Sequence, residues 1–227
     1  GAALTEAFLR QGARVAFCQR SDATPFCDAM ERATGNRPLF LPCDIAVTDQ
    51  LQLTLATAAK AHGPITTLVN NAPNDQRHDT LKTDESFWDW SIDVNLRSYF
   101  FACQSVIPGM QAAGGGSIIN FSSISFMMAD TGYAAYITAN AGIIGLTRTL
   151  AREFGPDRIR VNAIAPGWVL TDRQKQLWVT PDALASHLAR QCLPDPILPA
   201  DMAGAVLFLA ADASRMMTSQ TLILDGG

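Results

Sequence analysis

The chain has 227 residues, of which 48% are hydrophobic and 17% charged, so it is long and apolar enough to bury the core of one α/β domain. A net charge of −4 disfavours nucleic acid or an anionic membrane as partner, and no apolar run approaches the roughly 18 residues that span a bilayer. We therefore expect a soluble, cytoplasmic protein. The five cysteines are scattered and form no CxxC pair or metal-type cluster, which predicts reduced thiols and no metal site.

Short apolar strands alternate with longer amphipathic helices along the chain. The first part predicts helices over residues 2–11, 22–33 and 48–62, and strands over residues 14–18, 38–43 and 66–69. The second part predicts helices over residues 84–111 (kinked at Pro108), 132–154 and 200–211, and strands over residues 117–121, 159–164 and 221–224. This order is typical of a Rossmann-like, doubly wound parallel sheet of the α/β class, and we expect a single domain over residues 1–227.

Residues 171–199 break the alternation, because they contain four prolines and little strict periodicity. Such a stretch predicts a mobile lid with short helices. Polar clusters follow the predicted strands at positions 19–21, 44, 70–78, 122–123 and 167–171. Because ligands bind at the carboxyl ends of parallel strands, these clusters predict the binding edge of the sheet.

Three motifs, taken in order, resemble the short-chain dehydrogenase/reductase family over essentially the whole chain. They are an Asn-Asn-Ala turn after a strand, a serine followed 13 residues later by a tyrosine, and a Pro-Gly turn with a threonine four residues on. The resemblance implies an oxidoreductase that binds a nicotinamide dinucleotide. In this chain the motifs are Asn70-Asn71-Ala72 (with Pro73 where the family has glycine), Ser123 and Tyr136, and Pro166-Gly167 with Thr171.

The serine and the tyrosine carry the implied chemistry. Hydride transfer from a carbinol carbon needs a proton acceptor at the substrate oxygen, and a phenol can serve if its pKa falls from about 10 toward the working pH. Tyr136 is expected to be this acceptor, with Ser123 hydrogen-bonded to the same oxygen. The resemblance assigns Asn95 to holding a proton-relay water. Tyr133 lacks the spacing to a serine and is interpreted as packing.

One catalytic position departs from the family pattern. The family has Tyr-x-x-x-Lys, whereas this chain has Tyr136-Ile-Thr-Ala-Asn140. In the family, the lysine one helical turn from the tyrosine binds the ribose and supplies the positive charge that lowers the tyrosine pKa. Bringing a phenol from about 10 to about 7 takes roughly 4 kcal/mol, and asparagine brings no charge. We expect Asn140 to bind the ribose and catalysis to be weakened.

The residues after the strand at 14–18 distinguish the two dinucleotides. An Asp or Glu there binds the ribose 2′-OH of NAD, whereas an Arg suits the 2′-phosphate of NADP. Gln19-Arg20-Ser21 has no carboxylate, so Arg20 and Ser21 favour NADP, with NAD as the alternative. The resemblance places the other cofactor contacts at Tyr136 and Asn140 and at Gly1, Asp44, Ile45, Asn70, Asn71, Ala72, Pro166, Gly167, Val169 and Thr171.

Gly1 aligns with the last glycine of the family's glycine-rich turn, so the strand that the family has before this turn is missing. That strand lies between the strands at residues 14–18 and 66–69, and its absence would leave two unpaired inner edges. We therefore expect a gap in the sheet and an incomplete pyrophosphate site at the first helix. A shortened version of a longer chain is the favoured explanation, and a compromised protein is the alternative.

A narrower resemblance concerns the loops. Residues 70–78, 123–126 and 191–193 are similar to the branch that oxidises aldose sugars at the anomeric carbon to lactones, and Asp75, Arg77 and His78 would offer polar groups to sugar hydroxyls. Two alternatives stay open: an enzyme for another small alcohol, with a more apolar pocket, and a silent dinucleotide-binding homologue, which Asn140 favours. The resemblance also implies a homodimer or homotetramer formed through the two long helices.

Overall fold

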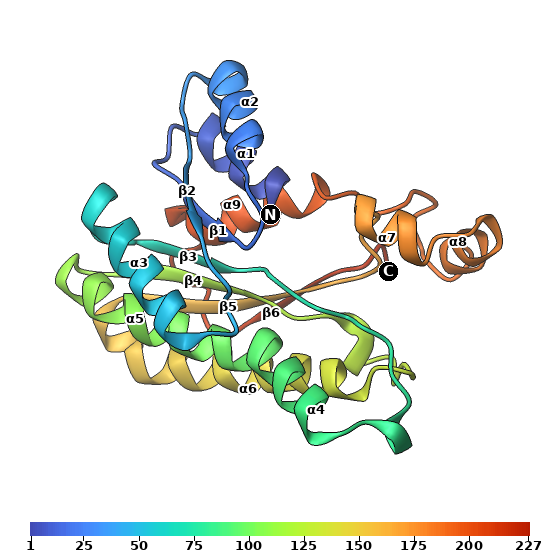
Figure 1. The fold of residues 1–227 in the computed structure, drawn as a ribbon. Helices are drawn as coiled ribbons and strands as arrows, with labels where there is room; N and C mark the ends of the chain where they lie inside the picture. Colours follow the sequence, from blue (N-terminus) through green and yellow to red (C-terminus); the bar gives the residue numbers. More distant parts are fainter.

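The computed structural model describes residues 1–227 and has helices on both faces of parallel strands (Figure 1). The strands are β1 (Ala16–Gln19), β2 (Leu39–Pro42), β3 (Thr67–Asn70), β4 (Gly116–Phe121), β5 (Ile159–Pro166) and β6 (Thr221–Leu224). The helices are α1 (Ala2–Arg10), α2 (Thr24–Thr34), α3 (Thr48–His62), α4 (Glu85–Ile92), α5 (Ser98–Ala112), α6 (Ala134–Phe154), α7 (Asp172–Leu177), α8 (Pro181–Leu188) and α9 (Asp201–Ala210). A π-helical segment, η2 (Asp93–Arg97), joins α4 to α5, and the short 3-10 turns are η1 (Thr80–Lys82), η3 (Ile124–Phe126), η4 (Gly155–Asp157) and η5 (Asp212–Ser214).

All strand pairs are parallel, but the strands form two separate sheets. One contains β1 and β2, and the other has the order β3-β4-β5-β6. Each crossover passes through helices, as a parallel connection requires. The predicted α/β, Rossmann-like class is confirmed, and the expected gap lies between β1 and β3.

The predicted elements lie close to the observed ones, and α3 and β6 have the predicted bounds. Gly12, at φ 78°, follows α1 in the left-handed conformation that ends many helices. The helix predicted over residues 84–111 is divided into two α-helices. Pro108 lies inside α5, and the long helix is interrupted at η2, where i→i+5 bonding replaces i→i+4 bonding. The stretch predicted as a lid contains α7 and α8.

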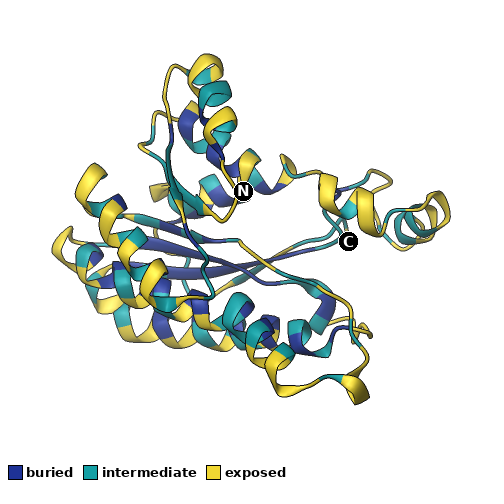
Figure 2. Cartoon of the chain, viewed as in Figure 1, coloured by how far each residue is buried: buried dark blue, intermediate teal, exposed yellow.

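The core has two parts, one on each face of the larger sheet (Figure 2). Helices α3, α5 and α6 cover one face, and α1 and α9 cover the other. Met110 and Ile118 are fully buried in the first part, and Ile164 and Leu209 in the second. This packing holds the carboxyl ends of β3 to β5 rigidly at one edge. No helix of the chain combines the length and apolar character that a membrane crossing requires.

Candidate active site

A cleft of about 650 Å³ lies at the carboxyl ends of β4 and β5, between α6 and α7. Most of the residues predicted from the sequence for catalysis, substrate and cofactor line this cleft. They are Gly1, Asn71, Asp75, Arg77, Asn95, Ser123, Tyr136, Asn140, Pro166, Gly167, Val169 and Thr171. Three others, Ile45, Asn70 and Ala72, line an adjoining cavity, and Arg20, Ser21, Asp44 and His78 line neither.

Ser123 and Tyr136 come from different elements and meet in the cleft. Ser123 follows β4 and begins η3, where its Oγ accepts a hydrogen bond of 3.1 Å from the Ser125 N–H. Because this bond uses only a lone pair of Oγ, the hydroxyl proton is free to be donated to a substrate oxygen. Tyr136 lies in the first turn of α6, and its phenol is close enough to Ser123 for that side chain to lower its pKa.

Burial dominates the ionisation of Tyr136. The pKa of Tyr136 is raised to about 12, chiefly by burial; Asp75 and Tyr133 add smaller raising effects, and hydrogen bonds from Ser123 and Asn140 lower it. Burial raises it because the charged phenolate loses hydration in the cleft. At neutral pH the phenol is therefore protonated, with roughly one molecule in 10⁵ ionised.

Asn140 lines the cleft one turn after Tyr136, at the position where the family has lysine. Its side chain is 3% exposed, and its amide nitrogen donates 2.9 Å to the Tyr136 carbonyl in its own helix. The Asn140 carbonyl accepts 2.9 Å from the Ser122 hydroxyl, which ties α6 to the end of β4. Asn140 is thus well placed but carries no charge that would offset the burial of Tyr136.

Tyr133 lies in the cleft, in addition to its predicted packing role. Its ring stacks on that of Tyr136 with centroids 5.4 Å apart, and its hydroxyl donates 2.9 Å to Asp130. The Arg77 guanidinium carbon lies 3.5 Å from the Tyr133 ring centroid and 5.4 Å from that of Trp178. This cation–π stack fixes the wall beside Tyr136.

Asp75 connects the loop after β3 to α7 across the cleft. Asp75 Oδ1 lies 2.9 Å from Arg173 Nη1, and Asp75 Oδ2 accepts 2.8 Å from the Gln174 amide. Gln174 Oε1 in turn accepts 2.9 Å from the Trp168 indole N–H. The Asp75 side chain is only 14% exposed, so the ion pair is less screened by solvent than a surface pair.

Three buried polar atoms of the cleft residues accept or donate no hydrogen bond. They are Asp75 Oδ1, which has only its ion pair with Arg173, Ser125 Oγ and His187 Nε2. The His187 ring packs edge-on against Trp168, and burial lowers the pKa of His187, so the neutral ring is favoured. Unpartnered buried polar atoms are costly, and their gathering in one cleft indicates a polar ligand.

The Asn95 side chain binds protein groups. Asn95 Oδ1 accepts 2.7 Å from the Asn74 N–H, and its amide donates 3.0 Å to the Asn74 carbonyl and 2.9 Å to the Ser91 carbonyl. Both amide protons are therefore used, and the side chain anchors the loop after β3. The π-helical segment η2 turns Asn95 toward this loop. A water relay through this residue stays a prediction.

His78 lies outside the cleft, contrary to the expectation that it faces the substrate. Its Nε2 accepts 3.3 Å from the Ala135 N–H at the start of α6, and its ring packs 4.7 Å from that of Phe87. The backbone N–H of His78 also donates 2.8 Å to the Gly132 carbonyl. His78 thus fastens the loop to α6, and the sugar contact predicted for it has no support in the geometry.

One end of the cleft has features that suit the pyrophosphate group of a dinucleotide. Gly1 caps α1 without a side-chain hydrogen bond, so the first N–H groups of this helix are free to bind an anion. A Cβ on Gly1 would meet the Asn71 amide at 4.0 Å, so the two residues form one wall. The backbone at Gly167 lies close to Asp225, because a Cβ on Gly167 would be 2.9 Å from the Asp225 Cα. Thr171 is the N-cap of α7, and its hydroxyl oxygen accepts a hydrogen bond from the Gln174 N–H.

The residues after β1 and β2 lie beyond the cleft. Arg20 and Ser21 are exposed, and Arg20 forms no ion pair. The nearby Asp22 carboxylate accepts from the N–H and hydroxyl of Thr24, and these bonds lower the pKa of Asp22. Asp44 Oδ1 accepts 3.0 Å from the Ala46 N–H. Among these side chains, Arg20 is the cation left without a partner.

Sequence reasoning missed several cleft residues. Tyr133 precedes Tyr136 by three positions, a spacing that places both on one helix face, so this neighbour was detectable. Arg173 and His187 have no such local signal, because tertiary packing brings them to the cleft.

Comparison with known proteins places the chain among dehydrogenases. A family model described as enoyl-(acyl carrier protein) reductase matches residues 1–227. A protein of Rhizobium meliloti named as a probable galactose dehydrogenase is 47% identical over 229 residues, covering 100% of this chain and 90% of its own. The D-xylose 1-dehydrogenase of Caulobacter vibrioides is 42% identical, with the same coverage.

A solved structure agrees with these relatives. The crystal structure of a Sinorhizobium meliloti protein assigned to the short-chain alcohol dehydrogenases superposes with a TM-score of 0.94 at 29% identity, covering 100% of this chain and 90% of that one. The regions aligned with the relatives and with the solved structure include every residue that lines the cleft. From these similarities and the meeting of Ser123 with Tyr136, the chain belongs to the short-chain dehydrogenase/reductase family of NAD(P)-dependent oxidoreductases.

Proposed function

We propose that the protein oxidises an aldose at its anomeric carbon to the corresponding lactone, with NADP⁺ or NAD⁺ as the hydride acceptor. The observation that carries the proposal is a set of buried polar atoms in the cleft that holds Ser123 and Tyr136: Ser125 Oγ and His187 Nε2 have no hydrogen-bond partner, and Asp75 Oδ1 has only its ion pair with Arg173. A neutral polyol offers both donors and acceptors, so its hydroxyls can bind all three atoms. The galactose and xylose dehydrogenases among the relatives support the same substrate class.

The cleft residues have separate roles in this oxidation. When bound, a nicotinamide dinucleotide would supply the acceptor for the hydride of the anomeric carbon. Tyr136 Oη, as phenolate, takes the proton of the anomeric hydroxyl, and the oxygen left behind becomes the lactone carbonyl. The Ser123 hydroxyl donates a hydrogen bond to that oxygen and so orients it for the reaction. Asp75 accepts from another sugar hydroxyl while Gln174 and Arg173 keep α7 over the cleft.

NADP⁺ is the proposed preference. Arg20 is exposed and unpaired after β1, whereas the carboxylate of Asp22 is occupied by Thr24 and cannot easily bind a ribose 2′-OH. A guanidinium pairs strongly with a phosphate through charge-assisted hydrogen bonds. Asn71, Asn140 and the N-terminus of α1 would hold the ribose and pyrophosphate in either dinucleotide.

The proposal is tested with a panel of aldopentoses, aldohexoses and apolar secondary alcohols, each with NADP⁺ and with NAD⁺. We expect at least one aldose to be oxidised and the apolar alcohols to react poorly. Ser125→Ala should raise the KM of that aldose by about tenfold, because a sugar hydroxyl loses its partner, and should leave NADPH binding close to that of the unaltered protein. Preferential oxidation of the apolar alcohols would contradict the proposal.

A second candidate function is dinucleotide binding without turnover. It is favoured by Asn140 at the lysine position together with the pKa of about 12 at Tyr136, since a phenol so rarely ionised is a poor base at neutral pH. Titration of NADPH fluorescence separates the two candidates. Tight binding with no oxidation of any aldose, even in alkaline solution, would establish the second candidate and refute the first.

A further inference from the structure

Each turnover of the proposed oxidation leaves a proton on Tyr136, and this proton must reach solvent before the next turnover. The sugar loses a hydride and a proton, so one proton is released for each nicotinamide reduced. The pKa of Tyr136 is raised to about 12, chiefly by burial, so its phenol gives up a proton to bulk water slowly. The groups around Tyr136 therefore determine how its phenolate is regenerated.

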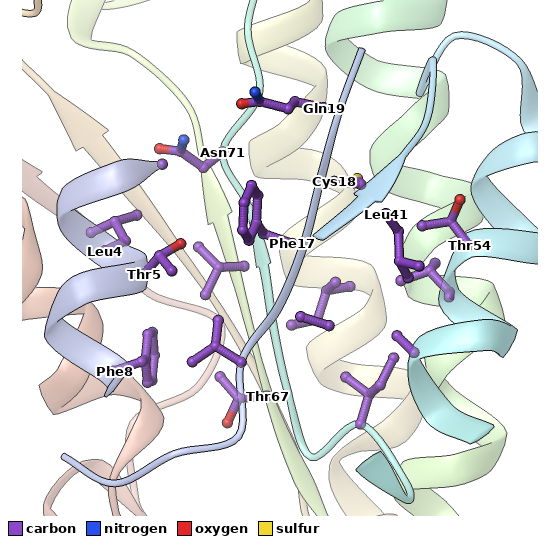
Figure 3. Close-up of a pocket in the computed structure, with 18 of the residues that line it drawn as sticks. Leu4, Thr5, Phe8, Phe17, Cys18, Gln19, Leu41, Thr54, Thr67 and Asn71 are labelled. Carbon is purple, nitrogen blue, oxygen red and sulfur yellow. The ribbon is translucent and has the colours of Figure 1, made fainter. Parts of the chain in front are cut away.

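The inner side of the cleft is unfavourable for a proton. Tyr99 of α5 lies near Tyr136 on this side and is 3% exposed, and burial raises its pKa above the ordinary value for a phenol. Tyr99 also lines the adjoining cavity of about 920 Å³, whose lining is mainly apolar. Figure 3 shows Leu4, Phe8 and Phe17 turned toward this cavity. A proton that left Tyr136 in this direction would enter apolar surroundings, which disfavour a charge.

Two polar neighbours on the remaining sides are already occupied. Both amide protons of Asn95 are bonded to protein groups, and an amide side chain takes up no proton at neutral pH. The Asp75 carboxylate could take up a proton, but its Oδ1 pairs with Arg173 and its Oδ2 accepts from Gln174. Protonation of Asp75 would break this ion pair and leave the Arg173 charge uncompensated, which is costly.

Tyr133 faces Tyr136 on the outer side and has a carboxylate partner. The two rings are stacked, with centroids 5.4 Å apart and planes 18° from parallel. The Tyr133 hydroxyl donates 2.9 Å to Asp130 Oδ2, and Asp130 lines the cleft while exposed to solvent. Among the three tyrosines of the chain, Tyr133 alone donates its hydroxyl to a carboxylate. The pair of Tyr133 and Asp130 thus leads from the stacked phenols to solvent.

Arg77 stabilises negative charge on Tyr133. Burial raises the pKa of the Tyr133 phenol, and the hydrogen bond and charge of Arg77 oppose this rise. The Arg77 guanidinium carbon lies 3.5 Å from the Tyr133 ring centroid. Tyr133 can therefore give its own proton to Asp130 and take up another, because the cation stabilises the charge that develops between the two transfers.

The backbone before Asp130 is strained. Ala129 has a φ of 53°, in the left-handed region that residues with a Cβ rarely adopt. The Asp130 N–H donates 3.2 Å to the Ser125 carbonyl, which closes the turn. Strain of this kind persists only where the surrounding structure requires it, and it gathers at functional sites. Here the strained turn brings the Asp130 carboxylate to the Tyr133 hydroxyl.

We propose that Tyr133 and Asp130 form a proton relay that returns Tyr136 to its phenolate form after each oxidation, an inference that rests on the proposed function. The Tyr136 hydroxyl gives its proton to a bridging water, and this water gives a proton to the Tyr133 oxygen. The proton of the Tyr133 hydroxyl moves to Asp130 Oδ2, and Asp130 releases it to solvent. Every O–H bond that breaks is matched by one that forms, and no electrons are exchanged.

The spacing of the two rings suits a single bridging water. Two O–H···O bonds of about 2.8 Å join oxygens up to about 5.6 Å apart. This span matches the 5.4 Å between the ring centroids of Tyr133 and Tyr136. Both rings also line the open cleft, where solvent has access.

The test compares kcat for aldose oxidation in dilute buffer and in concentrated imidazole at the same pH and ionic strength. Imidazole is a small base that can take the proton from Tyr136 directly. Tyr133→Phe keeps the stacked ring but removes the relay hydroxyl, and Asp130→Asn keeps an acceptor for Tyr133 but cannot take up a proton. In dilute buffer each variant should lose about three- to fivefold in kcat, and imidazole should restore most of this loss. A defect in packing would not be restored by imidazole.

Tyr99→Phe is the matched control, because it removes a phenolic hydroxyl that lines the same cleft but has no carboxylate partner. The ratio of its kcat values in the two buffers should equal that of the unaltered protein. Tyr133→Phe combined with Asp130→Asn should lose no more than either alone, because the two residues act as a unit. No loss in dilute buffer, or a loss that imidazole does not restore, would overturn the relay and leave the oxidation standing. Absence of oxidation by the unaltered protein would refute the proposed function and the relay with it.

Discussion

Replacing Asn140 by lysine should restore a positive charge one turn from Tyr136. Asn140 is buried at the wall of the cleft, so a charge at its position would act on Tyr136 with little screening by solvent. An opposite charge within about 4–6 Å lowers the pKa of an acid by about 1–3 units. The pKa of Tyr136, about 12 in this protein, would then be about 9–11. Below the pKa, each unit changes the phenolate fraction tenfold, so kcat/KM for aldose oxidation at neutral pH should rise about 10- to 1000-fold.

The assay is the pH dependence of kcat/KM, followed through the absorbance of the reduced nicotinamide. In the unaltered protein kcat/KM should rise with pH, because the phenolate is the active form. It should reach no plateau below about pH 12, since the pKa of Tyr136 is about 12. Asn140→Lys should shift this rising limb to lower pH. Asn140→Met, similar in length but uncharged, is the control. If both variants give the same profile, the absence of positive charge does not limit the reaction.

Three further substitutions test the remaining roles. Ser123→Ala removes the donor to the reacting oxygen and should lower kcat/KM about 10²–10³-fold, while an unchanged rate would show that Ser123 does not touch that oxygen. Asp75→Asn should shift the pH profile downward, since Asp75 raises the pKa of Tyr136, and should raise the aldose KM by freeing Arg173. Arg20→Glu should weaken NADP⁺ binding at least about tenfold and NAD⁺ binding less; equal losses would place Arg20 away from the 2′-phosphate.

Elements governed by local patterns could be predicted from the sequence. The helix over Thr48–His62 ends where Gly63, at φ 86°, precedes a proline, and both signals are local. The strands that lead into Asn70 and Ser122 are short apolar runs bounded by turns. The meeting of Ser123 with Tyr136 followed from a family resemblance in spacing, not from physical reasoning alone.

Contacts over long sequence separations could not be predicted. The Gln174 amide that binds Asp75 is 99 residues away, and no pattern in the lid marks it as a partner. His78 was expected to face the sugar as a polar loop residue, but the backbone N–H of Ala135 and the ring of Phe87 hold it against α6. The hydrogen bonds of Asn95 depend on the π-helical segment, which has no reliable sequence signature.

The central claim is that the Tyr136 phenol moves the proton during hydride transfer. The most direct measurement compares Tyr136→Phe with Tyr133→Phe, which keeps the stacked ring, in aldose oxidation and in NADPH fluorescence titration. We predict that Tyr136→Phe loses at least about 10³-fold in kcat, that Tyr133→Phe loses less than about tenfold, and that both still bind NADPH. Substantial turnover by Tyr136→Phe, or equal losses in the two variants, would contradict the assignment.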